Sequence, residues 1–158
     1  MSKPSKLSAV TVTGLTPHLG QVPPGYPSPW EAIAAGRKKW QLSSAFGLTD
    51  FGVNIVELPA GQASSLRHWH SHEDEFVYVM KGELALITDD GEQIVRPGMA
   101  VGFPKANANG HHFVNRGEGA AVYLEIGSRH ADDATFYSDV DLMYDPKDGF
   151  VTKGNDPK

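Results

Sequence analysis

The sequence predicts a single all-β domain, a small antiparallel sandwich or barrel. Its 158 residues are enough for one ordinary domain with a real core. Its 17 glycines and 11 prolines fall between short β-favouring runs rather than inside long helical periods. These runs recur about every ten residues, at 53–58, 66–70, 75–80, 83–88, 93–95, 100–103, 111–115 and 121–127.

Local signals define how some of these runs are joined. Asp89, Asp90 and Gly91 predict a tight hairpin, because Asp-Gly tolerates the positive φ that such turns require. Only residues 30–35 could form a helix, and a short one. The polar stretch from Asp145 to Lys158 contains Gly and Pro, so we expect it to be weakly ordered.

The first fifty residues differ in character from the rest. Four prolines between Gln21 and Trp30 (Pro23, Pro24, Pro27, Pro29) exclude a helix or a central strand and indicate an extended arm. Because this region also carries large aromatic residues, we expect it to pack on the barrel or on a second subunit. We therefore divide the chain into an N-terminal arm (1–49), a barrel core (50–130) and a partly irregular C-terminal extension (131–158).

Composition limits the classes of function. A net charge of −5 and a pI near 5.7 argue against a protein that binds the phosphate backbone of nucleic acids. Apolar runs such as Phe76 to Met80 are too short to span a membrane, and Met1 to Val10 lacks the apolar stretch of a secretory signal. With no cysteine, any metal must be held by nitrogen and oxygen ligands. We expect a cytoplasmic protein with a small-molecule partner.

One short stretch has the spacing of a metal site. In a strand, residues two apart share a face, so His68 and His70 can direct both imidazoles at one point. The chain then turns and returns with Glu75, which places a carboxylate opposite them. A later strand beginning at His111 offers a third imidazole. This ligand set suits Zn, Mn, Fe, Ni or Co as divalent ions, and leaves coordination positions open for a substrate.

These residues resemble the two motifs of the cupin superfamily. The first is Gly, His-x-His, four residues, Glu, six residues, Gly, and it matches from His68 to Gly82. The second is Gly, five residues, Pro, a gap, His, three residues, Asn, and it matches from Gly98 to Asn115. Gly61 is one residue further from the first histidine than is usual, and the gap after Pro104 is two residues longer. The resemblance covers residues 50–128 and implies a jelly-roll barrel, also called a double-stranded β-helix.

Two further histidines are alternative ligands. His72 shares strand parity with His70, but it breaks the Glu75 spacing of the motif, so we expect it to lie exposed in a turn. His112 must face away from its neighbour in a regular strand, and only His111 keeps three residues before Asn115. We therefore assign His68, His70, Glu75 and His111 as the metal ligands. The sequence identifies no catalytic acid or base.

The resemblance also implies what the protein does. The wording from Arg67 to Val79 is similar to a bacterial group of small cupins, some of which are labelled sugar phosphate isomerases by fold analogy, although fold does not fix function. We expect a metal-dependent isomerase acting on a small oxygen-rich substrate. The alternatives are an Fe(II) dioxygenase and a non-catalytic small-molecule sensor. The last would act through a partner protein, since no DNA-binding helix pair is present.

Other side chains have less specific interpretations. Four basic residues could clamp an anionic substrate, although scattered surface charge is the simpler reading: Arg67, Lys105, Arg116 and Arg129. Trp69, Phe76 and Tyr78 alternate away from the ligand face and should pack against the arm or a partner subunit. We expect a homodimer, because cupin barrels of this size commonly pair through an edge strand and an aromatic arm suits exchange between subunits.

Overall fold

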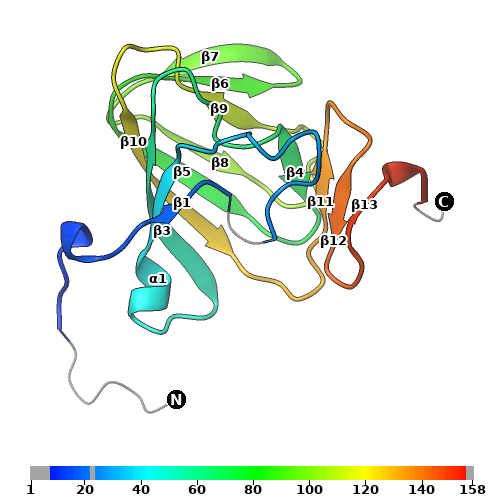
Figure 1. Cartoon of the computed structure of the whole chain (residues 1–158), viewed down its shortest axis with the longest axis horizontal. Helices are drawn as coiled ribbons and strands as arrows, with labels where there is room; N and C mark the ends of the chain where they lie inside the picture. Colours follow the sequence, from blue (N-terminus) through cyan, green and yellow to red (C-terminus); the bar gives the residue numbers. More distant parts are fainter. Residues whose placement is uncertain (1–7, 22–23, 156–158) are drawn as a thin grey trace.

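The computed structural model describes residues 8–21 and 24–155 and confirms the all-β prediction. Expectations about residues 1–7, Pro23 and residues 156–158 lie outside the described part. The elements, shown in Figure 1, are η1 (Val12–Gly14), β1 (His18–Leu19), β2 (Lys38–Gln41), α1 (Leu42–Ala45), β3 (Phe51–Leu58), β4 (His68–His70), β5 (Glu75–Lys81), β6 (Leu84–Thr88), β7 (Gly91–Val95), β8 (Ala100–Phe103), β9 (His112–Val114), β10 (Ala121–Ser128), β11 (Thr135–Tyr137), β12 (Met143–Asp145), β13 (Gly149–Val151) and η2 (Lys153–Asn155).

The strands form three antiparallel sheets. The largest has the order β1-β2-β3-β10-β5-β8, the second β13-β12-β11-β4 and the third β7-β6-β9. Each of the eight predicted β-runs contains a strand, with boundaries that shift by up to two residues. The expected hairpin joins β6 to β7, where Thr88 pairs with Gly91 across the Asp89-Asp90 turn and Gly91 has φ 119°. No helix in the described residues is long and apolar enough to span a membrane.

The hydrophobic core lies between the large sheet and the three-stranded sheet. It is built from residues that alternate inward along each strand, as period-2 patterning requires. Its buried members are Val56, Leu58, Val77, Val79, Leu84, Leu86, Val95, Phe113, Ala121 and Tyr123. Met99, Val101 and Phe103 are partly buried against it. The core thus fills one part of the barrel and leaves polar space beyond it.

The helix expected at 30–35 is wrong. This stretch is a series of turns, in which the amides of Ile33, Ala35 and Arg37 each donate to the carbonyl three residues earlier. Ala34 has φ 57°, a left-handed conformation that a right-handed helix cannot accommodate. The α-helix that the described residues do form is a single turn, α1, immediately after β2.

The expectation of weak order from Asp145 onward is wrong for residues 149–151, which form β13. This strand pairs with β12, and β12 pairs with β11. β11 in turn pairs with β4, where Phe136 lies opposite Trp69 and Thr135 opposite His70. The sequence suggested no such strands, yet they stand beside the predicted ligands (orange to red in Figure 1).

The proline-rich arm packs on the barrel of its own chain. The Tyr26 ring makes edge contacts with Tyr137 and Phe150, at centroid distances of 5.5 and 5.9 Å. Its hydroxyl accepts a hydrogen bond from the Leu66 amide, at 3.2 Å. Further along, β2 pairs with β3 and so extends the large sheet. These contacts make the N-terminal region one wall of the barrel interior.

Candidate metal centre

Two strands position the predicted histidine pair and carboxylate. On β4, His68 and His70 face the interior while Trp69 faces outward and stacks on Phe136 of β11, with centroids 4.4 Å apart. Trp69 therefore packs on the C-terminal extension within its own chain. Glu75 begins β5 and continues the inward-facing row whose later members, including Val77, enter the core.

His111 reaches the same place from the segment leading into β9. Its backbone exchanges two hydrogen bonds with His68, with N–O distances of 3.1 and 2.9 Å. Its ring is buried and stacks on Phe103, at a centroid distance of 3.5 Å and an interplanar angle of 5°. This stacking fixes the plane of the imidazole, and β-bridge pairing fixes its height in the barrel.

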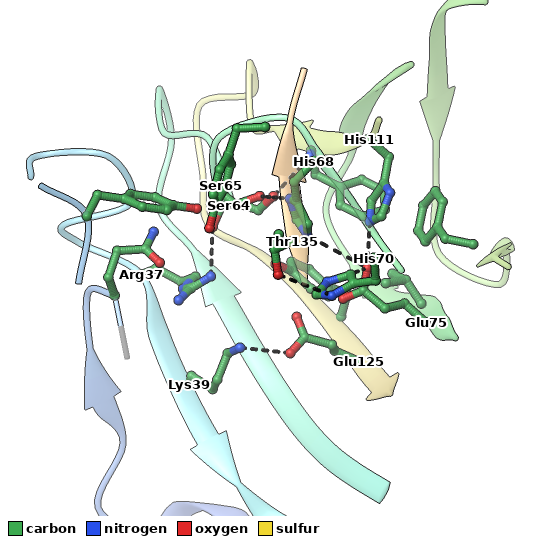
Figure 2. A pocket seen from close by; sticks show the side chains of 17 residues that line it. Arg37, Lys39, Ser64, Ser65, His68, His70, Glu75, His111, Glu125 and Thr135 are labelled. Carbon is green, nitrogen blue, oxygen red and sulfur yellow. Dashed lines mark hydrogen bonds and ion pairs between the residues drawn. The ribbon is translucent and has the colours of Figure 1, made fainter. Parts of the chain in front are cut away.

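The three predicted histidine ligands converge on one oxygen atom of the fourth ligand, Glu75. Glu75 Oε2 lies 2.8 Å from Nε2 of His111, 3.5 Å from Nε2 of His70 and 3.7 Å from Nε2 of His68. Donor atoms of His68, His70 and Glu75 all lie within 4.8 Å of one another, while His111 joins through Glu75. Figure 2 shows these side chains pointing toward one another from β4, from β5 and from the segment before β9.

The donor set fits a divalent cation. Glu75 Oε2 is buried and has no partner with hydrogen-bond geometry among the described residues, even though three ring nitrogens surround it. A buried carboxylate oxygen in that position is costly unless something neutralises it. Nitrogen and oxygen donors of this kind are those that the divalent ions from Mn to Zn accept.

Hydrogen bonds at the far side of two rings set their tautomers. Nδ1 of His68 lies 2.8 Å from the Leu66 carbonyl oxygen, and Nδ1 of His70 lies 2.7 Å from Oδ2 of Asp133. Since these oxygens accept, each Nδ1 carries the proton, and Nε2 is the nitrogen available to a cation. Asp133 was missed in the sequence, because it lies far from the motif in a polar loop.

The electrostatics of the cluster reflect its burial and its charges. Burial lowers the pKa of His68 to about 4, with the neighbouring imidazoles adding to the effect. Burial acts in the same direction on His70, but Asp133 and Glu75 overcome it and raise that pKa to about 10. Without a cation His70 therefore carries both ring protons at neutral pH, and a cation that binds Nε2 would displace one of them. Burial favours protonated Glu75, yet His111 and His70 hold its pKa well below the usual range. The carboxylate is therefore ionised and ready to bind a cation.

The alternative histidines lie outside the cluster. His72 is exposed, stacks on His130 with centroids 4.8 Å apart, and contacts the Ser71 hydroxyl through Nδ1. His112 faces away from His111, with Nδ1 2.9 Å from the Ser65 carbonyl oxygen. His112 thus follows the expected strand parity, whereas His72 lies exposed beyond the end of β4, where the motif spacing led us to expect it.

The remaining motif residues shape the backbone. Asn115 is buried, and its Nδ2 donates to the carbonyls of Leu58 and Gly119 at 2.9 and 2.8 Å. Gly82 has φ 76°, and a Cβ there would lie 2.9 Å from the Ala121 Cα. These two residues therefore brace loops rather than contact the cluster.

Two cavities lie beside the cluster. The larger, of about 210 Å³, has both polar and apolar side chains in its walls and is lined on one side by the N-terminal region. The smaller is about 170 Å³ and opens toward a loop that carries Asn107 and Asn109. Both are lined by His70, Glu75, Phe103 and His111. The larger cavity also contains residues that sequence reasoning missed: Arg37, Lys39 and Glu125.

The basic residues singled out in the sequence do not reach either cavity. Arg67 is engaged by Asp89 and Asp139, and Arg116 by Glu92. Lys105 and Arg129 are exposed. None of these four residues lines the two cavities beside the cluster, which supports the reading of scattered surface charge.

Comparisons with known proteins agree with this fold. A family model for the cupin domain matches residues 54–127. A crystal structure of a sugar phosphate isomerase from a cupin superfamily, from Silicibacter pomeroyi, is 39% identical with a TM-score of 0.87, and 96% of each chain is covered. The chain therefore belongs to the cupin superfamily.

More distant structures show how far the likeness extends. A protein from Acidithiobacillus ferrooxidans, named as a candidate sugar phosphate isomerase, is 28% identical with a TM-score of 0.72, covering 78% of this chain and 81% of its own. A polyketide cyclase from Streptomyces resistomycificus is 18% identical with a TM-score of 0.61, covering 78% and 80%, and shares the fold alone. No curated protein matches this sequence significantly.

Proposed function

We propose that this protein is a metal-dependent isomerase of sugar phosphates, with one divalent ion held by His68, His70, Glu75 and His111. The observation that carries the proposal is the convergence of three Nε2 atoms on the buried Oε2 of Glu75. The names of two relatives, given as sugar phosphate isomerases, support the choice of substrate class.

The chemistry needs an electrophile and a group that moves a proton. When bound, the ion would act as a Lewis acid toward a carbonyl oxygen and the neighbouring hydroxyl oxygen of the substrate. It would thereby lower the pKa of the C–H group on the carbon that carries this hydroxyl. The histidines and Glu75 would hold the ion, and Asp133 would keep His70 in the required tautomer. Hydroxyl groups on the walls of the larger cavity suit an oxygen-rich ligand: Tyr26, Ser65, Thr135 and Tyr137.

We assign the proton transfer to Glu125. The two carboxylates that line the larger cavity are Glu75 and Glu125, and only Glu125 lies outside the proposed ligand set. Its Oε1 accepts hydrogen bonds from Lys39 Nζ at 2.8 Å and Asn54 Nδ2 at 3.0 Å. Burial opposes its ionisation, but the charge of Lys39 outweighs this and lowers the pKa of Glu125. It is therefore a carboxylate at neutral pH, which is the form that accepts a proton.

Metal content is the first test. Protein expressed without added metal and purified without chelators should contain about one equivalent of a divalent ion by elemental analysis. His70→Ala should lose it, whereas His72→Ala, which removes an exposed histidine two residues away, should retain it. Equal metal content in the two variants would contradict the proposed ligand set.

Isomerisation is tested by proton exchange. In D2O, metal-loaded protein incubated with a panel of aldose and ketose phosphates should incorporate deuterium at the carbon beside the carbonyl, followed by NMR. Glu125→Gln should lower the exchange rate about 100-fold or more, because a general base typically contributes 10²–10⁴. Glu57→Gln is the matched control, since Glu57 pairs with Lys38 on the outer side of the same sheet.

Two results would replace this proposal. If no phosphate exchanges deuterium but Fe(II)-loaded protein consumes oxygen, the same donor set serves a dioxygenase. If ligands bind saturably to metal-loaded protein without exchange or oxygen uptake, the protein is a binding module.

A further inference from the structure

Arg37 has an environment unlike that of the other basic residues. It lies just before β2 and is 5% exposed. Among residues 8–21 and 24–155, no other Lys or Arg is buried. In that part of the chain no carboxylate oxygen lies within 4.0 Å of its guanidinium, whereas its neighbours Lys38 and Lys39 pair with Glu57 and Glu125. A buried charge without a counter-ion is costly, so its retention calls for an explanation.

Its own hydrogen bonds satisfy only part of the guanidinium. Nη1 donates to the Ser64 carbonyl at 2.7 Å, and Nη2 donates to the Gly20 carbonyl at 3.1 Å. A guanidinium has five N–H donors, so three remain. One of them is Nε, which is buried and has no hydrogen-bond partner among the described residues. The two carbonyls hold the planar group in place without neutralising it.

The Arg37 side chain lines the larger cavity. Arg37 and Lys39 are the two basic residues that line it, and Lys39 is already paired with Glu125. Figure 2 shows Arg37 on the opposite side of this cavity from Glu75 and His111. A ligand that reaches from the candidate metal centre across the cavity would therefore meet, at its far end, a positive charge that forms no ion pair with a carboxylate of the described residues.

We infer that Arg37 binds the phosphate group of the ligand that occupies this cavity. Fixed N–H donors in a fork match the oxygens of a phosphate, and Nη1 and Nη2 each keep one hydrogen that is not donated to the two carbonyls. The cavity, of about 210 Å³, fits one small phosphorylated molecule. This inference rests on the proposed function for the rest of the ligand, because the opposite end of the cavity is the metal centre.

The test measures the NMR signal of Arg37 directly, with inorganic phosphate as the probe. The protein is kept metal-free so that a metal ion cannot bind the phosphate. In 1H–15N NMR spectra, the Nε–H signal of Arg37 is identified by its loss in Arg37→Lys. If that variant does not fold, the signal is found by elimination with lysine variants of the other four arginines, Arg67, Arg96, Arg116 and Arg129. Phosphate should shift this signal saturably, and the other arginine signals should stay in place.

Affinity gives a second measurement. By calorimetry, Arg37→Lys should bind phosphate at least 10-fold more weakly, because an ammonium group keeps the charge but lacks the fork. Arg116→Lys makes the same change at an exposed arginine and should bind as the unaltered protein does. An unmoved Arg37 signal, a uniform shift of all arginine signals, or equal affinity in a folded Arg37→Lys variant would overturn the inference.

The outcome separates this inference from the proposed function. A specific Arg37 shift in a protein without isomerase activity would support the phosphate site and reject the isomerase. Deuterium exchange with an unchanged KM in Arg37→Lys would do the reverse.

Discussion

Oδ2 of Asp133 lies 2.7 Å from Nδ1 of His70, so a carboxylate in the loop before β11 determines which ring nitrogen of a β4 histidine faces Glu75. Oδ1 of the same carboxylate accepts a hydrogen bond from the backbone amide of His72, at 2.8 Å. The loop and the histidine are therefore held by one side chain. This arrangement couples the C-terminal extension to the candidate metal centre.

Asp133→Asn tests that coupling. An amide keeps the shape of the side chain but loses its charge, so the imidazole of His70 becomes a weaker metal ligand. We therefore expect the affinity for a divalent metal to fall about 10-fold. Affinity is measured by competition with a chromogenic chelator. Asp132→Asn changes an adjacent exposed carboxylate and should have no effect. An unchanged affinity for Asp133→Asn would show that the charge on this carboxylate does not support the site.

Metal binding should stabilise the fold. A ligand present at 100 times its Kd stabilises the native state by about 2.7 kcal/mol, which corresponds to a rise in Tm of about 5–10 °C for a chain of this size. Thermal melts with Zn²⁺ or Mn²⁺, and again after chelation, measure this rise. It should vanish in His111→Ala, and the same rise in that variant would place the ion elsewhere.

Gly82→Ala should destabilise the protein by about 1–3 kcal/mol. The residue has φ 76°, and the added Cβ would lie 2.9 Å from a backbone atom of Ala121, which cannot swing away. Urea unfolding measures the loss. Gly119→Ala is the control, since a Cβ there meets no atom within 4 Å. Equal midpoints for the two variants would contradict the strain argument.

The homodimer expected from the sequence stays a prediction, and the structure offers a face to test it. Phe76, Tyr78 and Met80 alternate on the outer side of β5 and are 41%, 40% and 49% exposed. Leu124 and Ile126 lie beside them on β10. A second copy of this sheet would cover such a surface with matching apolar side chains.

The double variant Phe76→Glu, Met80→Lys should therefore sediment as a monomer at micromolar concentration, while the unaltered chain sediments as a dimer. Exposed Lys81→Glu, at the end of the same strand, should leave the dimer intact. A monomeric mass for the unaltered chain would exclude the dimer outright.

Much of the barrel was predictable because its strands carry their own signals. Alternation along β5 separates Val77 and Val79 from Phe76 and Tyr78, and the same parity brings His68 and His70 to one face. The ligand cluster needs only this periodicity and the motif spacing. That is why the sequence identified four residues that do lie together.

The missed elements depend on distant partners. β11, β12 and β13 have three residues each, too short for periodicity to be visible, and they form by pairing in series from β4. Arg37 is the first of three consecutive basic residues, a run that predicts a solvated patch. In the fold, Arg37 is buried, Lys39 is half-buried inside the barrel, and Lys38 points outward. Such assignments arise from tertiary contacts that no local pattern records.

The centre also has two faces, because three of the four proposed ligands, His70, Glu75 and His111, line both the larger cavity and the smaller one. A bound cation would thus form part of a partition rather than the floor of a pocket. One reactant could approach it from the Arg37 side while water or a second small molecule approached from the side of Asn107. Two small molecules could then reach the ion without passing each other at one entrance.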